Sequence, residues 1–169
     1  MLPIKVIRDA DIGLSFPAPS AYRKRTSTRA IVFNDEVKVA ILHATKKNFH
    51  KLPGGGVEAG ENLPTALSRE LREEVGCSAK NLREFAIIEE YRNKYALHHI
   101  SHCFLADLAG EVGDTAMNES EIADGFVTEW MGLEDAIKTI AGETAIKSYQ
   151  GKFIRLRELA FLQEAARII

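Results

Sequence analysis

Residues 52–61 read Leu52-Pro53-Gly54-Gly55-Gly56-Val57-Glu58-Ala59-Gly60-Glu61, and residues 69–77 read Arg69-Glu70-Leu71-Arg72-Glu73-Glu74-Val75-Gly76-Cys77. Together they join a glycine-rich loop to a segment loaded with acids. In a helix, Glu70, Glu73 and Glu74 stand at i, i+3 and i+4 and share one face. Their mutual repulsion opposes folding unless cations bind there, and a divalent metal ion is the natural cation. We therefore expect a loop followed by a metal-binding helix.

The same helix carries an apolar stripe. Leu67, Leu71 and Val75 recur at i, i+4 and i+8, so one side of the helix faces a core while the acids lie at its edge. Mg²⁺ prefers carboxylate oxygens and water, and it takes part of its shell from substrate phosphates. The pattern therefore indicates phosphate chemistry at a site held by a packed helix.

These residues resemble the Nudix box, whose pattern is G-x5-E-x7-R-E-U-x-E-E-x-G-U with U a bulky apolar residue. Every fixed position can be filled, and the matching residues are Gly55, Glu61, Arg69, Glu70, Leu71, Glu73, Glu74 and Gly76. Only Cys77, which is small for the last U, departs mildly. A solvated amphipathic surface helix would explain the acids but not the loop and every offset together. The chain is thus identified as a member of the MutT-like Nudix family.

The resemblance implies an α/β/α sandwich in which a mixed β-sheet lies between helices. We expect one Nudix domain over residues 1–169, with an N-terminal strand and arm at 1–26 and the box at 54–76. A length of 169 residues with 46% hydrophobic content is enough to bury one sizeable core. This composition agrees with a single catalytic domain.

Several roles within the box can be stated as expectations. Adjacent glycines permit positive φ angles and close approach of backbone to a ligand, so Gly54 and Gly56 are expected to contact substrate, and the Gly55 carbonyl to contact metal. Arg69 can orient a neighbouring carboxylate by charge-assisted hydrogen bonds. The resemblance implies that Arg69 orients rather than attacks. It also implies two principal metal ligands, Glu73 and Glu74, while Glu70 is either a further ligand or the base that deprotonates water.

Candidate residues also lie outside the box. Arg29 and Lys51 border segments expected near the site, where each can hold a substrate phosphate. The family often supplies a further acid from a loop beyond the box, and residues 118–125 are the corresponding segment here. Its candidates are Glu119, Glu121 and Asp124, of which we favour Glu121 as a catalytic acid or base.

The expected reaction is Mg²⁺-dependent hydrolysis of a diphosphate linkage, with Mn²⁺ as a possible substitute. Metal ions neutralise phosphate oxygens and lower the pKa of a bound water, which attacks phosphorus. The leading substrates are a nucleoside triphosphate or 8-oxo-dGTP, and ADP-ribose or a dinucleoside polyphosphate is the alternative. A catalytically silent nucleotide-sensing module and an isomerase of diphosphate esters are further alternatives, both disfavoured by the intact glutamates.

Charge and cysteine content narrow the partners. A net charge of −2 and a pI near 6.2 give no basic field for a nucleic-acid polymer, so a small nucleotide-like substrate is expected. The two cysteines, Cys77 and Cys103, lack metal-type spacing. Neither a signal peptide nor a long apolar span is evident, so we expect a cytoplasmic protein without membrane contact. A homodimer is common in the family, although no stretch of this sequence marks an interface.

Apolar patterning places the remaining elements. We expect a strand at 4–7, a hairpin over 29–42, strands at 85–91, 95–105 and 126–131, and helices at 133–141 and 153–166. His98, His99, His102 and Cys103 fall on one of these strands. Because His99 and Cys103 share one face and the other two share the opposite face, we interpret all four as ordinary strand residues rather than a zinc site.

Overall fold

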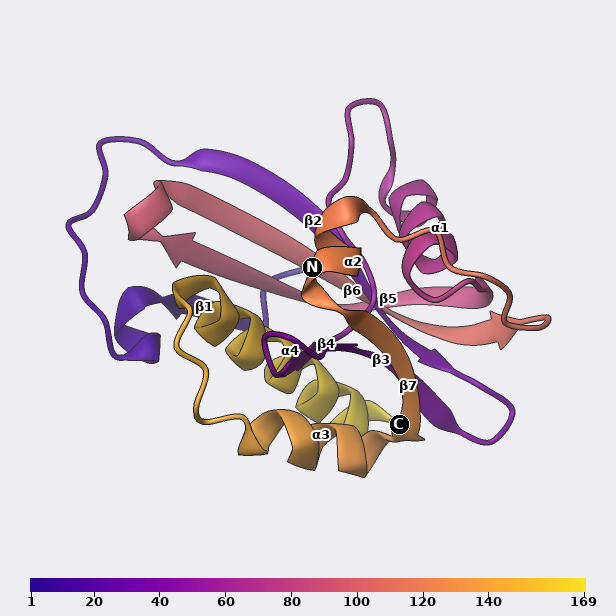
Figure 1. Cartoon of the computed structure of the whole chain (residues 1–169). Helices are drawn as coiled ribbons and strands as arrows, with labels where there is room; N and C mark the ends of the chain where they lie inside the picture. The colour runs from indigo at the N-terminus through magenta and orange to yellow at the C-terminus, as the bar shows by residue number, and fades with distance from the viewer.

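The computed structural model covers all 169 residues, and its centre is a mixed sheet of seven strands with helices on both faces (Figure 1). The strands are β1 (Lys5–Arg8), β2 (Arg23–Phe33), β3 (Lys38–Ala44), β4 (Phe49–Lys51), β5 (Ser78–Arg92), β6 (Leu97–Ala109) and β7 (Phe126–Gly132). The helices are α1 (Leu63–Glu74), α2 (Glu119–Asp124), α3 (Leu133–Gly142) and α4 (Tyr149–Ile168), with short 3-10 turns at η1 (Asp9–Ile12) and η2 (Asn93–Tyr95).

Strand pairing follows the order β1-β5-β6-β2-β3-β4, and β7 pairs with β3. The β1–β5 and β2–β6 pairs are parallel, whereas β2–β3, β3–β4, β3–β7 and β5–β6 are antiparallel. Strand β5 begins seven residues before the expected 85–91 and β6 ends four residues after the expected 95–105, because the start of β5 pairs with the end of β6. The long β2–β6 pairing places residues 23–29 beside residues 97–103, which later form one wall of the site.

Two apolar clusters lie on opposite faces of the sheet. One cluster includes Leu67, Leu71 and Val75 of α1 with residues of β2, β3 and β6. The other includes Phe153 and Phe161 of α4 with residues of β1, β2, β3, β5 and β6. Helix α3 packs beside α4 on that second face (Figure 1). The expected α/β/α sandwich with a mixed sheet is confirmed.

Helix α1 has local signals at both ends. The Asn62 side chain accepts a hydrogen bond from the Thr65 N–H at 2.9 Å, and Pro64 sits in the first turn, where its missing N–H costs nothing. After the helix, Gly76 has φ +71, and a Cβ there would lie 2.3 Å from the Gly113 carbonyl oxygen. Glycine is therefore required where the chain leaves α1.

The segment 118–125 was expected to be a loop, and this expectation is wrong, because residues 119–124 form helix α2. Asn118 accepts from the Glu121 N–H at 3.0 Å, and the Glu121 carboxylate accepts from the Asn118 N–H at 2.9 Å. Gly125 ends the helix with φ +69. This reciprocal cap satisfies the first amides of a six-residue helix that has no buried residues to signal it in the sequence.

The sheet face that packs on α4 changes from apolar to charged along β2 and β6. Ile31 and Cys103 are buried among apolar side chains, whereas Arg29 and His99, on the same faces of the same two strands, are buried among charges. Both cysteines are free and buried, and burial raises the pKa of the Cys77 thiol to about 11. No helix has the length and apolar character that crossing a membrane requires.

Candidate active site

The glycine loop is tied directly to β2 and to the end of α1. Gly54 donates its N–H to Oε2 of Glu74 at 2.6 Å, and the Gly55 carbonyl accepts from the Thr28 N–H at 2.9 Å. Gly54 has φ +128, and a Cβ there would lie 2.2 Å from the Thr28 carbonyl oxygen. A Cβ on Gly55 would lie 2.2 Å from Oε1 of Glu70. The loop therefore needs glycine at position 54, where backbone leaves no room for a Cβ, and a Cβ at position 55 would displace the Glu70 carboxylate.

Arg69 binds several acceptors around this loop. Its Nε and Nη2 contact the two oxygens of Glu61 at 2.9 and 3.0 Å, which is a bidentate pair. Its Nη1 donates to Oε1 of Glu70 at 2.8 Å, and Nη2 also donates to the Gly56 carbonyl at 3.0 Å. The Arg69 hydrogen bond lowers the pKa of Glu61 to about 2. Arg69 thus fixes the loop, the helix and the Glu70 carboxylate relative to one another.

The three glutamates of the helix face sit in different environments. Glu74 is almost fully buried, and Lys51 Nζ contacts its Oε1 at 2.7 Å, while the side chain of Glu73 is 40% exposed. Glu70 is buried, and this burial raises the pKa of its carboxyl, although Arg69 acts in the opposite direction. Hard carboxylate oxygens converging beside a backbone loop form a donor set that suits Mg²⁺. Because the Gly55 carbonyl already accepts one hydrogen bond, one lone pair is left for such an ion.

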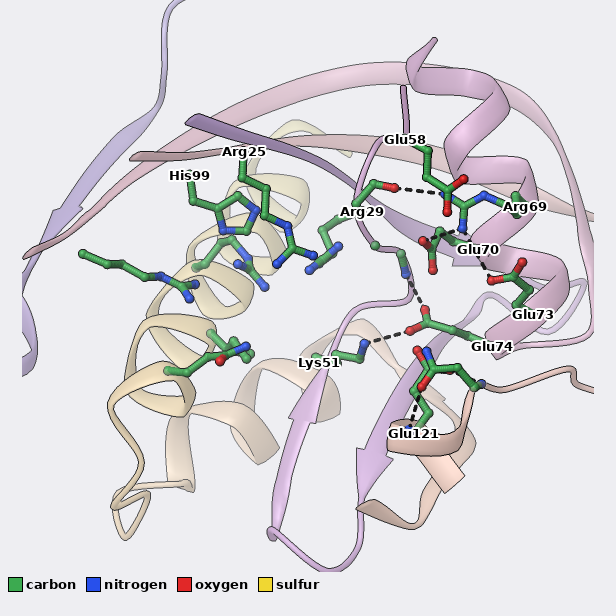
Figure 2. A pocket seen from close by; sticks show the side chains of 18 residues that line it. Arg25, Arg29, Lys51, Glu58, Arg69, Glu70, Glu73, Glu74, His99 and Glu121 are labelled. Atoms are coloured by element: carbon green, nitrogen blue, oxygen red, sulfur yellow. Dashed lines mark hydrogen bonds and ion pairs between the residues drawn. The ribbon is translucent and has the colours of Figure 1, made fainter. Parts of the chain in front are cut away.

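These groups line a cavity of about 420 Å³, which is a volume suited to a small molecule. The lining is almost entirely polar, with one apolar residue among eighteen. The lining residues are Arg25, Arg29, Lys51, Gly54, Gly55, Gly56, Glu58, Arg69, Glu70, Glu73, Glu74, Arg92, His99, Asn118, Glu121, Gln150, Ile154 and Arg157. Figure 2 shows the glutamates gathered on the side of α1 and α2, and most of the basic groups on the opposite side near α4.

Most candidates from the sequence border this cavity. Arg29 and Lys51 line it, but each already has a carboxylate partner: Arg29 Nε lies 3.5 Å from Glu158, and Lys51 contacts Glu74. Glu121 also lines the cavity, whereas Glu119 does not. Asp124 lies outside and pairs with Lys47 at 2.6 Å. Of the three acids proposed beyond the box, only Glu121 is therefore placed to act here.

Four basic residues of the lining are not among the site residues predicted from the sequence, namely Arg25, Arg92, His99 and Arg157. The interpretation of His99 as an ordinary strand residue is wrong to this extent, because His99 forms part of the cavity wall. His98 and His102, on the opposite face of β6, contact Glu89 and Glu84 at 2.8 and 2.7 Å instead. The sequence holds one signal for these basic lining residues. Arginines alternate at the start of β2, which puts Arg25 on the same face of the strand as Arg29.

The family model for the NUDIX domain matches residues 23–155 of the chain. The chain belongs to the Nudix family. This match includes the glycine loop, α1 and β2, as well as the first residues of α4 that line the cavity. The identification from the box is confirmed, and so is the enzyme class, a MutT-like Nudix pyrophosphohydrolase.

Relatives of this Nudix hydrolase differ in the substrates that their names state. The RNA pyrophosphohydrolase of Ruthia magnifica subsp. Calyptogena magnifica is 32% identical over 130 residues, covering 67% of this chain and 73% of that protein. The 8-oxo-dGTP diphosphatase of Buchnera aphidicola subsp. Schizaphis graminum (strain Sg) is 38% identical over 102 residues, covering 58% and 70%. The diphosphoinositol polyphosphate phosphohydrolase 3-alpha of Mus musculus is 26% identical over 125 residues, covering 72% and 71%.

A solved structure of a NUDIX hydrolase from Nitrosomonas europaea superposes with a TM-score of 0.61 at 17% identity, covering 85% of this chain and 90% of that one. At this identity the likeness concerns the fold. It supports the sandwich architecture described above and carries no information on the substrate.

Proposed function

We propose that this Nudix protein is an Mg²⁺-dependent hydrolase of a diphosphate linkage in a small phosphorylated substrate, acting by attack of water at phosphorus. The observation that carries the proposal is the convergence of Glu70, Glu73 and Glu74 beside the glycine loop, at one end of a cavity whose other end is cationic. Carboxylates suit the metal ion, and guanidinium groups suit the phosphates that the ion does not hold.

Each residue of the site has a separate role in the proposed reaction. Glu73 and Glu74 would hold Mg²⁺, with Glu70 and the Gly55 carbonyl as further donors. Mg²⁺ would supply charge neutralisation at the phosphate oxygens and a bound water of lowered pKa. Arg69 keeps the Glu70 carboxylate and the loop in register, so it is a positioning residue. No serine or cysteine nucleophile is needed.

Glu70 is better placed than Glu121 to accept a proton from the attacking water. Glu70 is buried against Gly55 and keeps Oε2 free of the Arg69 hydrogen bond. The Glu121 carboxylate also has one oxygen engaged, by the Asn118 N–H, but it lies on α2, whereas Glu70 shares a face of α1 with Glu73 and Glu74. If Glu70 is the base, Glu70→Gln removes the acidic limb of the pH–rate profile. If Glu121 is the base, that limb disappears in Glu121→Gln instead.

The substrate is best sought in a panel that covers the named activities of the relatives. Nucleoside triphosphates and 8-oxo-dGTP are the substrates predicted from the resemblance, and ADP-ribose and dinucleoside polyphosphates are the alternatives. A relative named for RNA and one named for diphosphoinositol polyphosphates add 5′-triphosphorylated RNA and inositol pyrophosphates to the panel. All of these contain the diphosphate linkage that the proposal requires.

The test measures phosphate release from this panel with Mg²⁺, with pyrophosphatase added in one series and a phosphatase in another. Glu73→Gln should lose at least about a hundredfold in kcat, because a metal ligand is worth more than a supporting residue. Glu84→Gln is the matched control, because Glu84 pairs with His102 and does not line the cavity, and it should keep full activity. Hydrolysis that persists in Glu73→Gln would contradict the proposal.

The alternative from a different class is a nucleotide-sensing module without turnover. It would show tight, Mg²⁺-dependent nucleotide binding, unchanged by hours of incubation, with no phosphate released from any member of the panel. The complete set of box glutamates and the polar cavity favour hydrolysis.

A further inference from the structure

The basic end of the cavity is built from residues that lie far apart in the chain. Arg25 and Arg29 come from one face of β2, Arg92 from the end of β5, His99 from β6 and Arg157 from α4. In Figure 2 the labelled Arg25, Arg29 and His99 lie across the cavity from Glu70, Glu73 and Glu121. The cavity therefore has an acidic half and a basic half that face each other.

Three of these arginines belong to a buried charge network beneath the basic half. Arg157 contacts Glu90 at 3.0 Å and Glu158 at 2.5 Å, Arg92 pairs with Glu90, and Arg29 lies near Glu158. The five residues carry three positive and two negative charges. Glu90 and Glu158 are fully buried and do not line the cavity, whereas all three arginines do. The cavity wall is thus cationic, with its carboxylates behind it.

This network carries more positive than negative charge, which favours an anion beside it. Burying ionised groups requires compensation for lost hydration, and here one positive charge has none from within the network. Arg29 is only 7% exposed; its buried Nε faces Glu158 at 3.5 Å and its Nη1 donates to the Thr28 carbonyl, while Nη2 has no hydrogen-bond partner within the chain. Arg25 adds a further positive charge, since it forms no ion pair with any carboxylate of the chain.

The same half offers little to a nucleobase. Ile154 is the single apolar residue of the lining, and the His99 imidazole is its one aromatic ring, since no Phe, Tyr or Trp borders the cavity. Nucleobases are usually held by stacking on large aromatic side chains together with hydrogen bonds to their edges, and rings of this kind, Tyr95, Phe126 and Tyr149 among them, line an adjoining pocket instead. The guanidinium forks present here match phosphate oxygens in bidentate geometry, and several forks together favour several phosphates.

We propose that the basic half of the cavity, formed by Arg25, Arg29, Arg92 and Arg157, binds additional phosphate groups of the substrate. The substrate class is then a small polyphosphorylated molecule that carries further phosphates beside the diphosphate to be cleaved, with these phosphates rather than a base as the main recognition element. This inference rests on the proposed function for the cleavage step, but it makes a claim about binding that can be tested without turnover.

The binding test uses myo-inositol hexakisphosphate, which has six phosphates, no base and no diphosphate linkage to cleave. Calorimetry is done without Mg²⁺ on Glu73→Gln protein, so that catalysis and metal binding play no part. Arg25→Gln in this background should weaken binding by about tenfold, the value of one charged hydrogen bond. Arg23→Gln is the matched control, because Arg23 is an exposed arginine of the same strand that does not line the cavity.

Arg25 is exposed and has no intramolecular partner, so its substitution should leave the thermal midpoint unchanged and the comparison is not confounded by misfolding. Equal weakening by Arg23→Gln and Arg25→Gln, or binding of AMP as tight as that of the hexakisphosphate, would overturn the proposal. Binding of AMP as tight as that of the hexakisphosphate would indicate that the base contributes to recognition.

A kinetic test then links binding to turnover. In the active protein, kcat/KM for 5-diphosphoinositol pentakisphosphate should exceed that for dGTP, and Arg25→Gln should reduce the first value about tenfold more than the second. If dGTP is the better substrate and Arg25→Gln lowers both values equally, the proposal is wrong. Absence of any hydrolysis would count against the proposed function, while the calorimetric result would still decide the inference on binding.

Discussion

Arg69 illustrates how a single side chain organises the site. Its N–H donors make four hydrogen bonds, to Glu61, Glu70 and the Gly56 carbonyl, so the loop and the helix cannot move independently. A lysine could make only one or two of these contacts, because its ammonium is a point charge without the planar fork. Most of these contacts are at invariant offsets within the box, which explains why a linear pattern predicts them.

The Arg69–Glu61 pair should make the stability of the fold depend on pH in the acidic range. The pKa of Glu61 is about 2 in the folded protein and 4.5 in the unfolded reference. Because the folded value is lower, the stabilisation is fully present above pH 4.5 and is lost as pH falls toward 2. The wild-type thermal midpoint should therefore fall faster over this window than that of Glu61→Gln. Parallel curves for the two proteins from pH 5 to pH 3 would contradict this assignment.

Gly54 should be intolerant of a side chain. Alanine there meets the Thr28 carbonyl and keeps an unfavourable φ, so Gly54→Ala should lower the free energy of unfolding by at least about 2 kcal/mol. Gly142→Ala is the control, since a Cβ at Gly142 meets nothing within 4 Å and its φ is ordinary. Urea unfolding measures both. A loss of less than about 0.5 kcal/mol in Gly54→Ala would show that the loop can shift away from β2.

Among the elements, β3, β4 and β7 are joined by a polar cluster as well as by their ladders. His43 and His50 pair across β3 and β4, with His43 Nδ1 at 2.8 Å from Glu129 and His50 Nδ1 at 2.5 Å from Glu143, next to the end of α3. The ligand atoms of His43, His50 and Glu129 lie within 4.8 Å of one another. However, the two imidazole rings are stacked, with an angle of 17° between their planes, so the in-plane lone pairs of the two histidines do not converge on one ion.

Loss of His50 should destabilise this edge of the sheet. Glu143 is largely buried and one of its oxygens already lacks a partner, so His50→Ala would leave the whole carboxylate without a hydrogen bond. We expect a loss of about 1 to 3 kcal/mol in the free energy of unfolding, measured with urea. His102→Ala should lower the free energy of unfolding by less, because His102 and its partner Glu84 are both more exposed than His50 and Glu143. Equal costs would indicate that Glu143 finds water instead.

For the molecule as a whole, the network between the sheet and α4 couples stability to the site. Burial tends to raise the pKa of Glu90, but Arg157, His99 and Arg92 together hold it below its ordinary value, so Glu90 is charged. Burial lowers the pKa of His99 to about 4, so His99 is neutral at pH 7. The charge of the network at neutral pH therefore comes from its arginines and glutamates alone.

Removing Arg157 should be destabilising because two buried carboxylates each lose a partner: Glu158 keeps only Arg29 at 3.5 Å, and Glu90 keeps Arg92. Arg157→Met should cost about 3 to 5 kcal/mol, the usual effect of breaking a buried ion pair on one side. The triple variant Arg157→Met, Glu90→Gln, Glu158→Gln leaves Arg29 and Arg92 without their carboxylates, so it should recover none of that loss. Chemical denaturation of both variants tests this. A triple variant more stable than the single one would show that Arg29 and Arg92 do not depend on Glu90 and Glu158.

Local sequence predicts the acidic half of the cavity well. The glycine loop and α1 are adjacent in the chain, and their residues meet through helical spacing and turn geometry, both of which can be derived from the printed sequence. Helix α2 was missed because its signal, a capping box around Asn118, is short and lacks an apolar stripe. Strands β5 and β6 exceeded expectation because pairing with each other, rather than apolar patterning, extends them.

The sequence alone specified the family, the sandwich and the acidic half of the cavity, since these depend on short-range periodicity and on a motif with many constrained positions. The basic half depends on the three-dimensional arrangement. Arg25, Arg92 and Arg157 come from three separate elements, and each looks like an ordinary surface charge until parallel pairing of β2 with β6 and packing of α4 bring them together. Non-local contacts of this kind leave no periodic trace in the chain, so only the folded structure shows that the arginines share one wall.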